Sequence, residues 1–433
     1  MPNDLQLSAS LRARRPAPVE HVESAFDGEL RLFLAELCCE LCRLRHVRED
    51  GIAPEDVTTM RESQLATSSA FADIVVTPRG APGYFVEIKY GLPLDETVRR
   101  VRRKYALNQL AACNRLVVVV RDLDAALLKA RLRDCVCPSL DIEIWDETRL
   151  LSEVKAHFGI RIGSLAKPNI TALHRSILQA TWRRVFDDDY DEILASSLLW
   201  HFNSWTLKRL REQSRLGPVD IWRPGTYADV AIVMADLCSF SAYVRDTPDE
   251  RIVQEVLTAF YSKSRHVVHE FDGMLYQFVG DEVAALFGFP DKKPGYVADA
   301  FDCAKALLDV GVSTSGAWEC RIDRVHDKRG LHIGIAMGEL NLLPLRSFAR
   351  SHIGFLGDAL NMSARLATEA QPGEIVISNG VYQALDDDAQ TDFVENRPVS
   401  AKNVGMLRSW RRVAQGGGSI EAASGRAQLG DVC

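Results

Sequence analysis

The sequence lacks long apolar runs, a leader peptide and an excess of positive charge. No stretch of about 18 consecutive apolar residues occurs among the 433 residues, so we expect no membrane-spanning helix. The first residues, MPNDLQLSAS, contain no basic stretch followed by an apolar run, so we expect no secretory signal and a cytoplasmic protein. With 52 basic and 59 acidic residues the formal net charge is −7, which argues against a basic coat over the whole surface and leaves a local patch open.

Cysteine is scattered rather than arranged as a framework. The ten cysteines are spread over the chain and several lie in apolar runs, which favours buried thiols in a reducing compartment over disulfides. Cys39 and Cys42 have the spacing of half a zinc site, but no second pair follows at ligand spacing. We therefore predict buried helix thiols there.

Composition divides the chain into four parts. Residues 1–165 alternate short apolar runs with helical patterns, which predicts an α/β domain. The elements expected there are a helix over 30–44, strands over 72–76, 84–88 and 116–120, and a helix over 94–112. Residues 166–227 are expected to form a helical connector, 228–413 a second domain, and the Gly/Ser-rich residues 414–433 a disordered tail.

The pattern of residues 228–413 predicts a β-α-β-β-α-β core. The expected elements are a strand ending at Leu237, a helix over 249–270, strands over 274–279 and 282–287, a helix over 296–310, strands over 331–337, 339–343 and 374–378, and short helices near 359–368 and 380–385. In such a core Asp236 and the hairpin residue Asp281 can meet on adjacent central strands. Paired carboxylates are typical of a Mg²⁺ or Mn²⁺ site, although each Asp could simply end a strand or favour a turn.

Five ordered segments carry a resemblance to a known family. They read ADLCSFS, FDGMLYQFVGDEVAALFG, LHIGIAMGEL, GFLGDALNMSARL and QPGEIVIS. Together they resemble the catalytic domain of class III nucleotide cyclases. The resemblance implies an α+β, ferredoxin-like domain and a lyase that converts a nucleoside triphosphate to its 3′,5′-cyclic monophosphate and pyrophosphate. It also implies two divalent metal ions, Mn or Mg.

The resemblance assigns the metal and catalytic roles residue by residue. Asp236 and Asp281 would ligate the two ions, with the backbone carbonyl of Leu237 as a further ligand. Asn361 would orient the ribose, and Arg365 would stabilise charge on the α-phosphate. In this family the carboxylates and the Asn/Arg pair meet across a head-to-tail homodimer, so the sites would be shared. The alternative for the Asn/Arg pair is a solvated helix face.

The resemblance also implies contacts to the triphosphate. The backbone around Phe240 and Ser241 would approach the phosphates, and Lys402 would bind them. The surroundings of Lys402 lack the second glycine and lysine usual in the family, so this assignment is the weaker one.

Two positions that choose the base in the family fit neither purine pattern. Gln277 stands where adenylate cyclases have Lys and guanylate cyclases have Glu, and Gly354 stands where Asp, Thr or Cys is usual. This departure resembles the bacterial antiphage pyrimidine cyclases, which implies UTP, or else CTP, as substrate and a separate effector that reads cyclic UMP or cyclic CMP. Tyr243 is expected to fill the space of a purine, unless it is a core aromatic. The rival hypotheses are a divergent adenylate or guanylate cyclase and a nucleotide-binding domain without turnover.

The first domain has a shorter motif of its own. Asp73, Glu87 and Lys89 form a D-x13-E-x-K pattern that resembles the restriction-endonuclease-like fold, with Gln109 on the following helix. The resemblance implies a Mg²⁺-binding acidic pair and a lysine that activates water; the alternatives are a sensor for nucleic acid or a phage product, or ordinary strand-edge charges. The basic run over 99–104 could contact nucleic-acid phosphates or be a solvated helix face.

Overall fold

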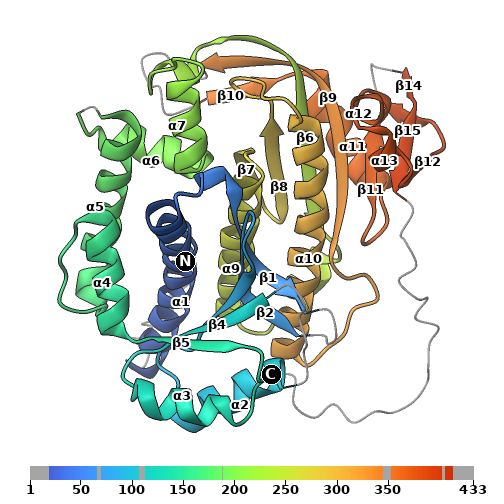
Figure 1. The fold of residues 1–433 in the computed structure, drawn as a ribbon. Coiled ribbons are helices and arrows are strands. Elements are labelled where there is room, and N and C mark those ends of the chain that lie inside the picture. The colour runs from blue at the N-terminus through green and yellow to red at the C-terminus, as the bar shows by residue number, and fades with distance from the viewer. Residues whose placement is uncertain are drawn as a thin grey trace, which may run out of the picture.

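The computed structural model describes residues 19–65, 70–106, 113–187, 189–344, 353–401 and 405–412. Within them lie a five-stranded sheet, an eight-stranded sheet and a two-stranded hairpin, β13 (Val399–Ala401) with β14 (Gly405–Leu407). Three connector helices lie between the two large sheets in the sequence (Figure 1). The predicted tail over 414–433 falls outside the described residues.

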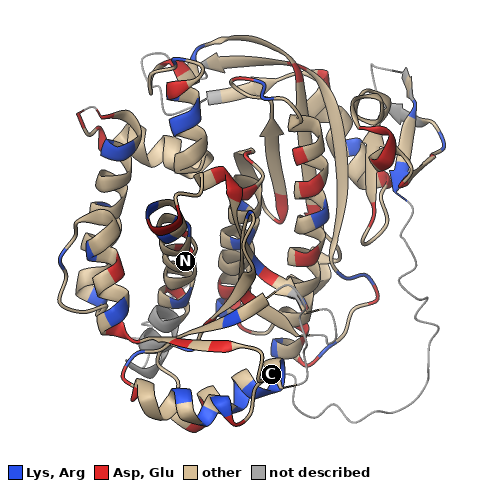
Figure 2. Cartoon of the chain, viewed as in Figure 1, with Lys and Arg blue, Asp and Glu red and all other residues tan. Residues whose placement is uncertain are grey.

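The N-terminal sheet has the strand order β1-β2-β3-β4-β5. Strands β1 to β3 pair antiparallel, and β3 to β5 pair parallel. Its elements are α1 (Val19–Arg45), η1 (His46–Asp50), η2 (Pro54–Asp56), β1 (Val57–Gln64), β2 (Phe71–Pro78), β3 (Gly83–Ile88), α2 (Leu94–Tyr105), β4 (Cys113–Val119), α3 (Ala125–Arg133), β5 (Asp141–Trp145) and α4 (Glu147–Phe158). Helices α1 and α4 share a core with one face of the sheet, and α2 and α3 with the other. Helices α2 and α3 are rich in basic side chains (Figure 2).

The three predicted strands and the first helix of this region are present, and two strands were missed. Strand β1 reads VTTMRESQ and β5 reads DIEIW, and neither has the continuous apolar run that identified the others. The helix expected over 94–112 ends at Tyr105, and residues 107–112 fall outside the described part. Cys39 and Cys42 are buried in α1, where burial raises the pKa of each thiol to about 12, so the prediction of helix thiols is confirmed.

The connector is helical, as expected, and packs on its own chain. Its elements are α5 (Lys167–Phe186), α6 (Glu192–His201), α7 (Ser204–Glu212) and the short η3 (Asp220–Trp222). Trp182, Phe202 and Trp222 share one buried cluster with Ile232 and Leu286 of the second sheet. The aromatic residues of the connector therefore cover part of that sheet.

The second sheet has the order β12-β15-β11-β9-β6-β8-β7, with β10 paired to β9. Its elements are β6 (Gly225–Leu237), α8 (Phe240–Asp246), α9 (Glu250–Glu270), β7 (Met274–Val279), β8 (Glu282–Phe287), α10 (Tyr296–Ile322), β9 (Leu331–Pro344), β10 (Ile353–Leu356), α11 (Asp358–Glu369), β11 (Ile375–Ser378), α12 (Asn379–Ala384), α13 (Asp387–Gln390), β12 (Phe393–Glu395) and β15 (Ser409–Arg412). Strands β6, β7, β8 and β9 with helices α9 and α10 form the predicted β-α-β-β-α-β core.

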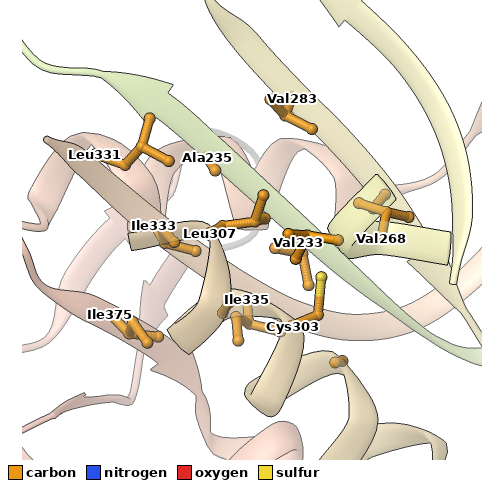
Figure 3. Packing of buried hydrophobic residues seen from close by; sticks show 14 of the residues in the cluster. Val233, Ala235, Val268, Val283, Cys303, Leu307, Leu331, Ile333, Ile335 and Ile375 are labelled. Carbon is orange, nitrogen blue, oxygen red and sulfur yellow. The ribbon is translucent and has the colours of Figure 1, made fainter. Parts of the chain in front are cut away.

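Successive residues of β6 face opposite sides of this sheet. Ala231, Val233 and Ala235 pack in the cluster formed with α9 and α10, part of which Figure 3 shows. Ile232 and Met234 pack on the other side, in the cluster that contains residues of α11 and of the connector. Asp236 continues this second series, so its side chain lies on the α11 side of the sheet.

Several elements of the second domain differ from expectation. The strands predicted over 331–337 and 339–343 are one strand, β9, because Gly338 stays paired with Val230, next to a bulge in β6. A side chain at Gly338 would crowd Ala359 of α11, so glycine here serves close packing rather than a turn. Helix α10 runs on to Ile322, and the short helix α8 was missed. In the described part of the chain, no helix is long and apolar enough to cross a membrane.

Candidate functional site

Asp236 and Asp281 lie together at one end of the central strands. Strand β6 pairs antiparallel with β8, with Ala235 opposite Val283, so the last residues of β6 lie beside the turn that opens β8. That turn is the predicted two-residue hairpin, Gly280–Asp281, between Val279 and Glu282. Gly280 has φ 63°, a left-handed conformation that glycine adopts without strain.

The two carboxyl groups are close enough to share a hydrogen bond. Burial, the hydrogen bond to Asp236 and the charge of Asp236 raise the pKa of Asp281 to about 7. The pKa of Asp236 is lowered: burial opposes the change, and hydrogen bonds from His332 and Asp281 outweigh it. Two carboxyls that must hold a proton between them are a site where a divalent cation would relieve the repulsion. The donor set thus fits a hard cation.

His332 is the immediate neighbour of this pair, and the sequence analysis gave it no role. Its Nε2 atom lies 3.3 Å from Oδ2 of Asp236, and its Nδ1 donates a hydrogen bond of 2.6 Å to the carbonyl of Ala367 in α11. The hydrogen bond to Asp236 raises the pKa of His332, while burial opposes this. His332 could have been predicted only from the pairing of β9 with β6, because this register places His332 directly opposite Asp236.

The turn after β6 holds the predicted phosphate-binding backbone. Ser239, with φ 60°, precedes α8, and the amide of Cys238 donates to the carbonyl of Gly330 at 2.9 Å. The Phe240 ring packs edge-on against Trp318, with ring centroids 6.0 Å apart, and Ser241 is exposed. Leu237 is buried at the end of β6.

Tyr243 does not lie at this surface. Its ring is 0% exposed, stacked on Trp318 at 5.1 Å, and its hydroxyl donates a hydrogen bond of 3.0 Å to Glu319. The prediction that this ring fills the base pocket does not fit the placement, because α8 turns it into the α10 side of the sheet. The core-aromatic alternative agrees with the structure.

The two base-selecting positions lie on segments that touch. Gln277 is exposed on β7 and pairs with Ala284, which pairs with Met234, so it shares the sheet face of Asp236. Gly354 is buried in β10 opposite Leu343. The next residue, Phe355, packs edge-on against Tyr276 at 5.2 Å, which brings β10 to the residue beside Gln277.

Asn361 and Arg365 stand four residues apart on α11 and are exposed. Helix α11 lies so close to β9 that a side chain at Gly334 would collide with backbone atoms of Ser363 and Ala367. Helical spacing puts the Asn/Arg pair on the side of α11 that faces away from Gly334. Among the described residues, neither side chain forms a hydrogen bond or an ion pair with Asp236 or Asp281. Lys402 falls outside the described residues.

Part of the chain is similar to proteins of a known family. Residues 223–411 match the family model described as adenylate and guanylate cyclase catalytic domain. This region is therefore similar to the catalytic domains of adenylate and guanylate cyclases. An adenylate cyclase of Mycobacterium tuberculosis is 24% identical over 210 residues, covering 46% of this chain and 44% of the relative. A putative adenylate cyclase 3 of Rhizobium meliloti is 24% identical over 176 residues, covering 40% and 26%.

The chain thus spans less than half the length of these curated relatives. Among solved structures, the adenylyl cyclase CyaB from P. aeruginosa is 17% identical and covers 44% of this chain and 97% of its own, with a TM-score of 0.38.

A second polar cluster lies in the N-terminal sheet. Lys89 Nζ is 2.8 Å from Asp73 and 2.5 Å from Glu87, so the three residues of the D-x13-E-x-K pattern are in contact. Lys104 of α2 joins them, with Nζ 2.9 Å from Asp73 and 2.8 Å from Glu87, and Tyr105 donates a hydrogen bond of 2.7 Å to Glu87. The sequence analysis did not place these last two residues in the cluster. Gln109 falls outside the described residues.

Proposed function

We propose that the chain is a nucleotide cyclase that joins the ribose 3′-oxygen of a nucleoside triphosphate to its α-phosphorus and releases pyrophosphate. The single observation that carries this proposal is the Asp236–Asp281 pair, which meets where the end of β6 lies beside the turn that opens β8. Two bound Mg²⁺ or Mn²⁺ ions would supply activation of the hydroxyl and charge neutralisation. Among the chain's own residues, His332 orients Asp236 from the neighbouring strand.

The second part of the proposal is a homodimer with two shared sites. Asn361 and Arg365 are exposed on α11, and among the described residues neither forms a hydrogen bond or an ion pair with Asp236 or Asp281. In a homodimer, Asn361 and Arg365 of one chain would lie next to Asp236 of the other chain. There the arginine would pair with phosphate oxygens and the asparagine with the ribose.

We propose that the base of the substrate is a pyrimidine, and that UTP is preferred over CTP. The exposed amide of Gln277 shares the sheet face of Asp236, and an amide can both donate to and accept from a pyrimidine edge. Gly354 offers no side chain to a purine. The product would then be a second messenger, cyclic UMP or cyclic CMP, read by a separate effector in antiphage defence. The second candidate is a purine, which is favoured by relatives named adenylate cyclase.

One experiment tests activity and base together. The purified chain is incubated separately with ATP, GTP, CTP and UTP in the presence of Mn²⁺, and the products are identified by mass spectrometry. A dominant cyclic UMP or cyclic CMP signal supports the pyrimidine proposal, and a dominant cyclic AMP or cyclic GMP signal replaces it with the purine candidate. The Asp236→Asn chain is the matched control, because it should give no product with any of the four.

A further inference from the structure

Two neighbouring helices of the N-terminal sheet carry a local excess of positive charge in this acidic protein. Helix α2 has five basic and two acidic side chains and α3 has three basic and none acidic, so together they hold a net charge of +6 in a chain of net charge −7. The two helices pack against each other along one face of the sheet, and Figure 2 shows their basic residues gathered there. Such asymmetry is the electrostatic footprint of a polyanion-binding surface.

These side chains reach solvent. We define the α2–α3 surface by residues that are exposed or half-buried on the two helices: Arg99, Arg102, Arg103, Lys129, Arg131 and Arg133. The Arg99 side chain is 76% exposed although it pairs with Glu96, and Arg131 is 53% exposed although it pairs with Asp95 of α2. The second pair also joins the two helices.

The cluster beneath α2 anchors this surface and excludes a cation. The ammonium of Lys104 lies between the carboxylates of Asp73 and Glu87. Lys89, which directly follows β3, contacts both carboxylates as well. The two positive charges balance the two negative charges, and the Glu87 side chain is fully buried. The place that a Mg²⁺ ion would take between the acids is therefore filled by Lys104. The cluster does not fit a metal, in contrast to the Asp236–Asp281 pair.

We propose that the α2–α3 surface binds the phosphate backbone of nucleic acid, without regard to base sequence and without cutting it. Arginines on two adjoining helices give several guanidinium contacts to successive phosphates. The cluster of Asp73, Glu87, Lys89 and Lys104, whose charges balance, supports α2 in place of a metal-dependent nuclease centre. This proposal does not depend on the cyclase activity of residues 223–411.

The test measures binding by the full chain to labelled duplexes of DNA and of RNA, by fluorescence anisotropy at several salt concentrations. The variant Arg99→Gln/Arg102→Gln/Arg133→Gln should bind about tenfold or more weakly than the natural chain, with a shallower dependence of log K on log salt. The matched control, Arg223→Gln/Arg251→Gln/Arg408→Gln, removes the same charge from exposed side chains outside the N-terminal sheet and should change affinity about twofold at most.

Three results would overturn the proposal. They are no binding of the natural chain to either duplex at low salt, equal losses in the two triple variants, and strand scission when Mg²⁺ or Mn²⁺ is added. An unchanged thermal unfolding midpoint shows that the first variant is folded, so that its loss reports the surface. Preference for one of the two duplexes identifies which nucleic acid the surface takes.

Discussion

The backbone amide of Thr59 donates a hydrogen bond of 2.9 Å to Glu270, the last residue of α9. The hydroxyl of Thr59 donates to the other carboxylate oxygen at 3.0 Å, and Arg43 of α1 also hydrogen-bonds Glu270. The Glu270 side chain is only 5% exposed. Since α9 leads directly through a turn into β7 and the Asp281 hairpin, this carboxylate ties the N-terminal sheet to the strand pair that carries the candidate site.

Replacing Glu270 should therefore lower the stability of the fold. Glu270→Ala leaves the buried Arg43 without its main counter-charge, and we expect the free energy of unfolding to fall by about 3 kcal/mol or more. Urea titration followed by circular dichroism measures this. Glu255→Ala on the same helix removes an exposed ion pair with Arg321 and should cost under about 1 kcal/mol. Equal losses in the two variants would contradict a structural role for the Glu270 contacts.

Asp236→Asn and Asp281→Asn should each abolish cyclisation while keeping the fold. An amide at either position removes a negative charge that the proposed ions need, and we expect turnover to fall at least about a hundredfold. Product formation is followed by mass spectrometry and folding by circular dichroism. Asp302→Asn, at a half-buried residue of α10, is the control and should keep full activity. Substantial turnover by Asp236→Asn with Mn²⁺ present would rule out the assigned metal site.

Mixing two inactive variants should restore activity if the sites are shared. Asp281→Asn lacks the carboxylate half and Arg365→Ala lacks the arginine half, so a mixed dimer has one intact site. Random pairing predicts about a quarter of the natural activity. The pair Asp236→Asn with Asp281→Asn should recover nothing, because both variants damage the same half. Failure of the first mixture, once mixed dimers are shown by native mass spectrometry, would contradict shared sites.

Base preference should respond to Gln277 and not to Tyr243. Gln277→Lys places the residue usual in adenylate cyclases on the exposed face of β7, and we expect the ratio of ATP to UTP turnover to rise. Tyr243→Phe removes only a buried hydrogen bond to Glu319, worth about 1 kcal/mol of stability, and should leave that ratio unchanged. A shift of the ratio in Tyr243→Phe alone would mean that the buried ring influences the base pocket after all.

His266 should make the protein less stable in mild acid. Burial lowers the pKa of His266 from 6.5 to about 4. The charge of Glu270 opposes this lowering and the charge of Arg61 adds to it. The Nε2 atom of His266 donates a hydrogen bond of 2.6 Å to the carbonyl of Thr59. Between these two pKa values the unfolded chain takes up the proton first, so stability falls as the pH drops from about 6.5 towards 4. His266→Gln keeps a donor without titrating, and its unfolding midpoint should fall less over this range. Parallel curves for the two proteins would contradict the argument.

Local patterns in the sequence determined much of this architecture. Apolar runs and helical periodicity identified the β-α-β-β-α-β core, the hairpin at Gly280–Asp281 and the α11 helix with Asn361 and Arg365 four residues apart. These features depend on residues near one another in the chain, where the periods of strand and helix are imposed by backbone geometry. The five ordered segments likewise indicated the similarity of residues 223–411 to cyclase catalytic domains.

Only the tertiary structure decided which side chains meet. His332 reaches Asp236 because β9 pairs with β6 in one particular register, and Lys104 fills the space between Asp73 and Glu87 because α2 packs across β2 and β3. Tyr243 is in the core because of the direction in which α8 leaves β6, which no local pattern shows. Each outcome depends on packing between segments far apart in the sequence. The physical cause is the packing of helix and sheet faces against one another rather than the local conformational propensity of any residue.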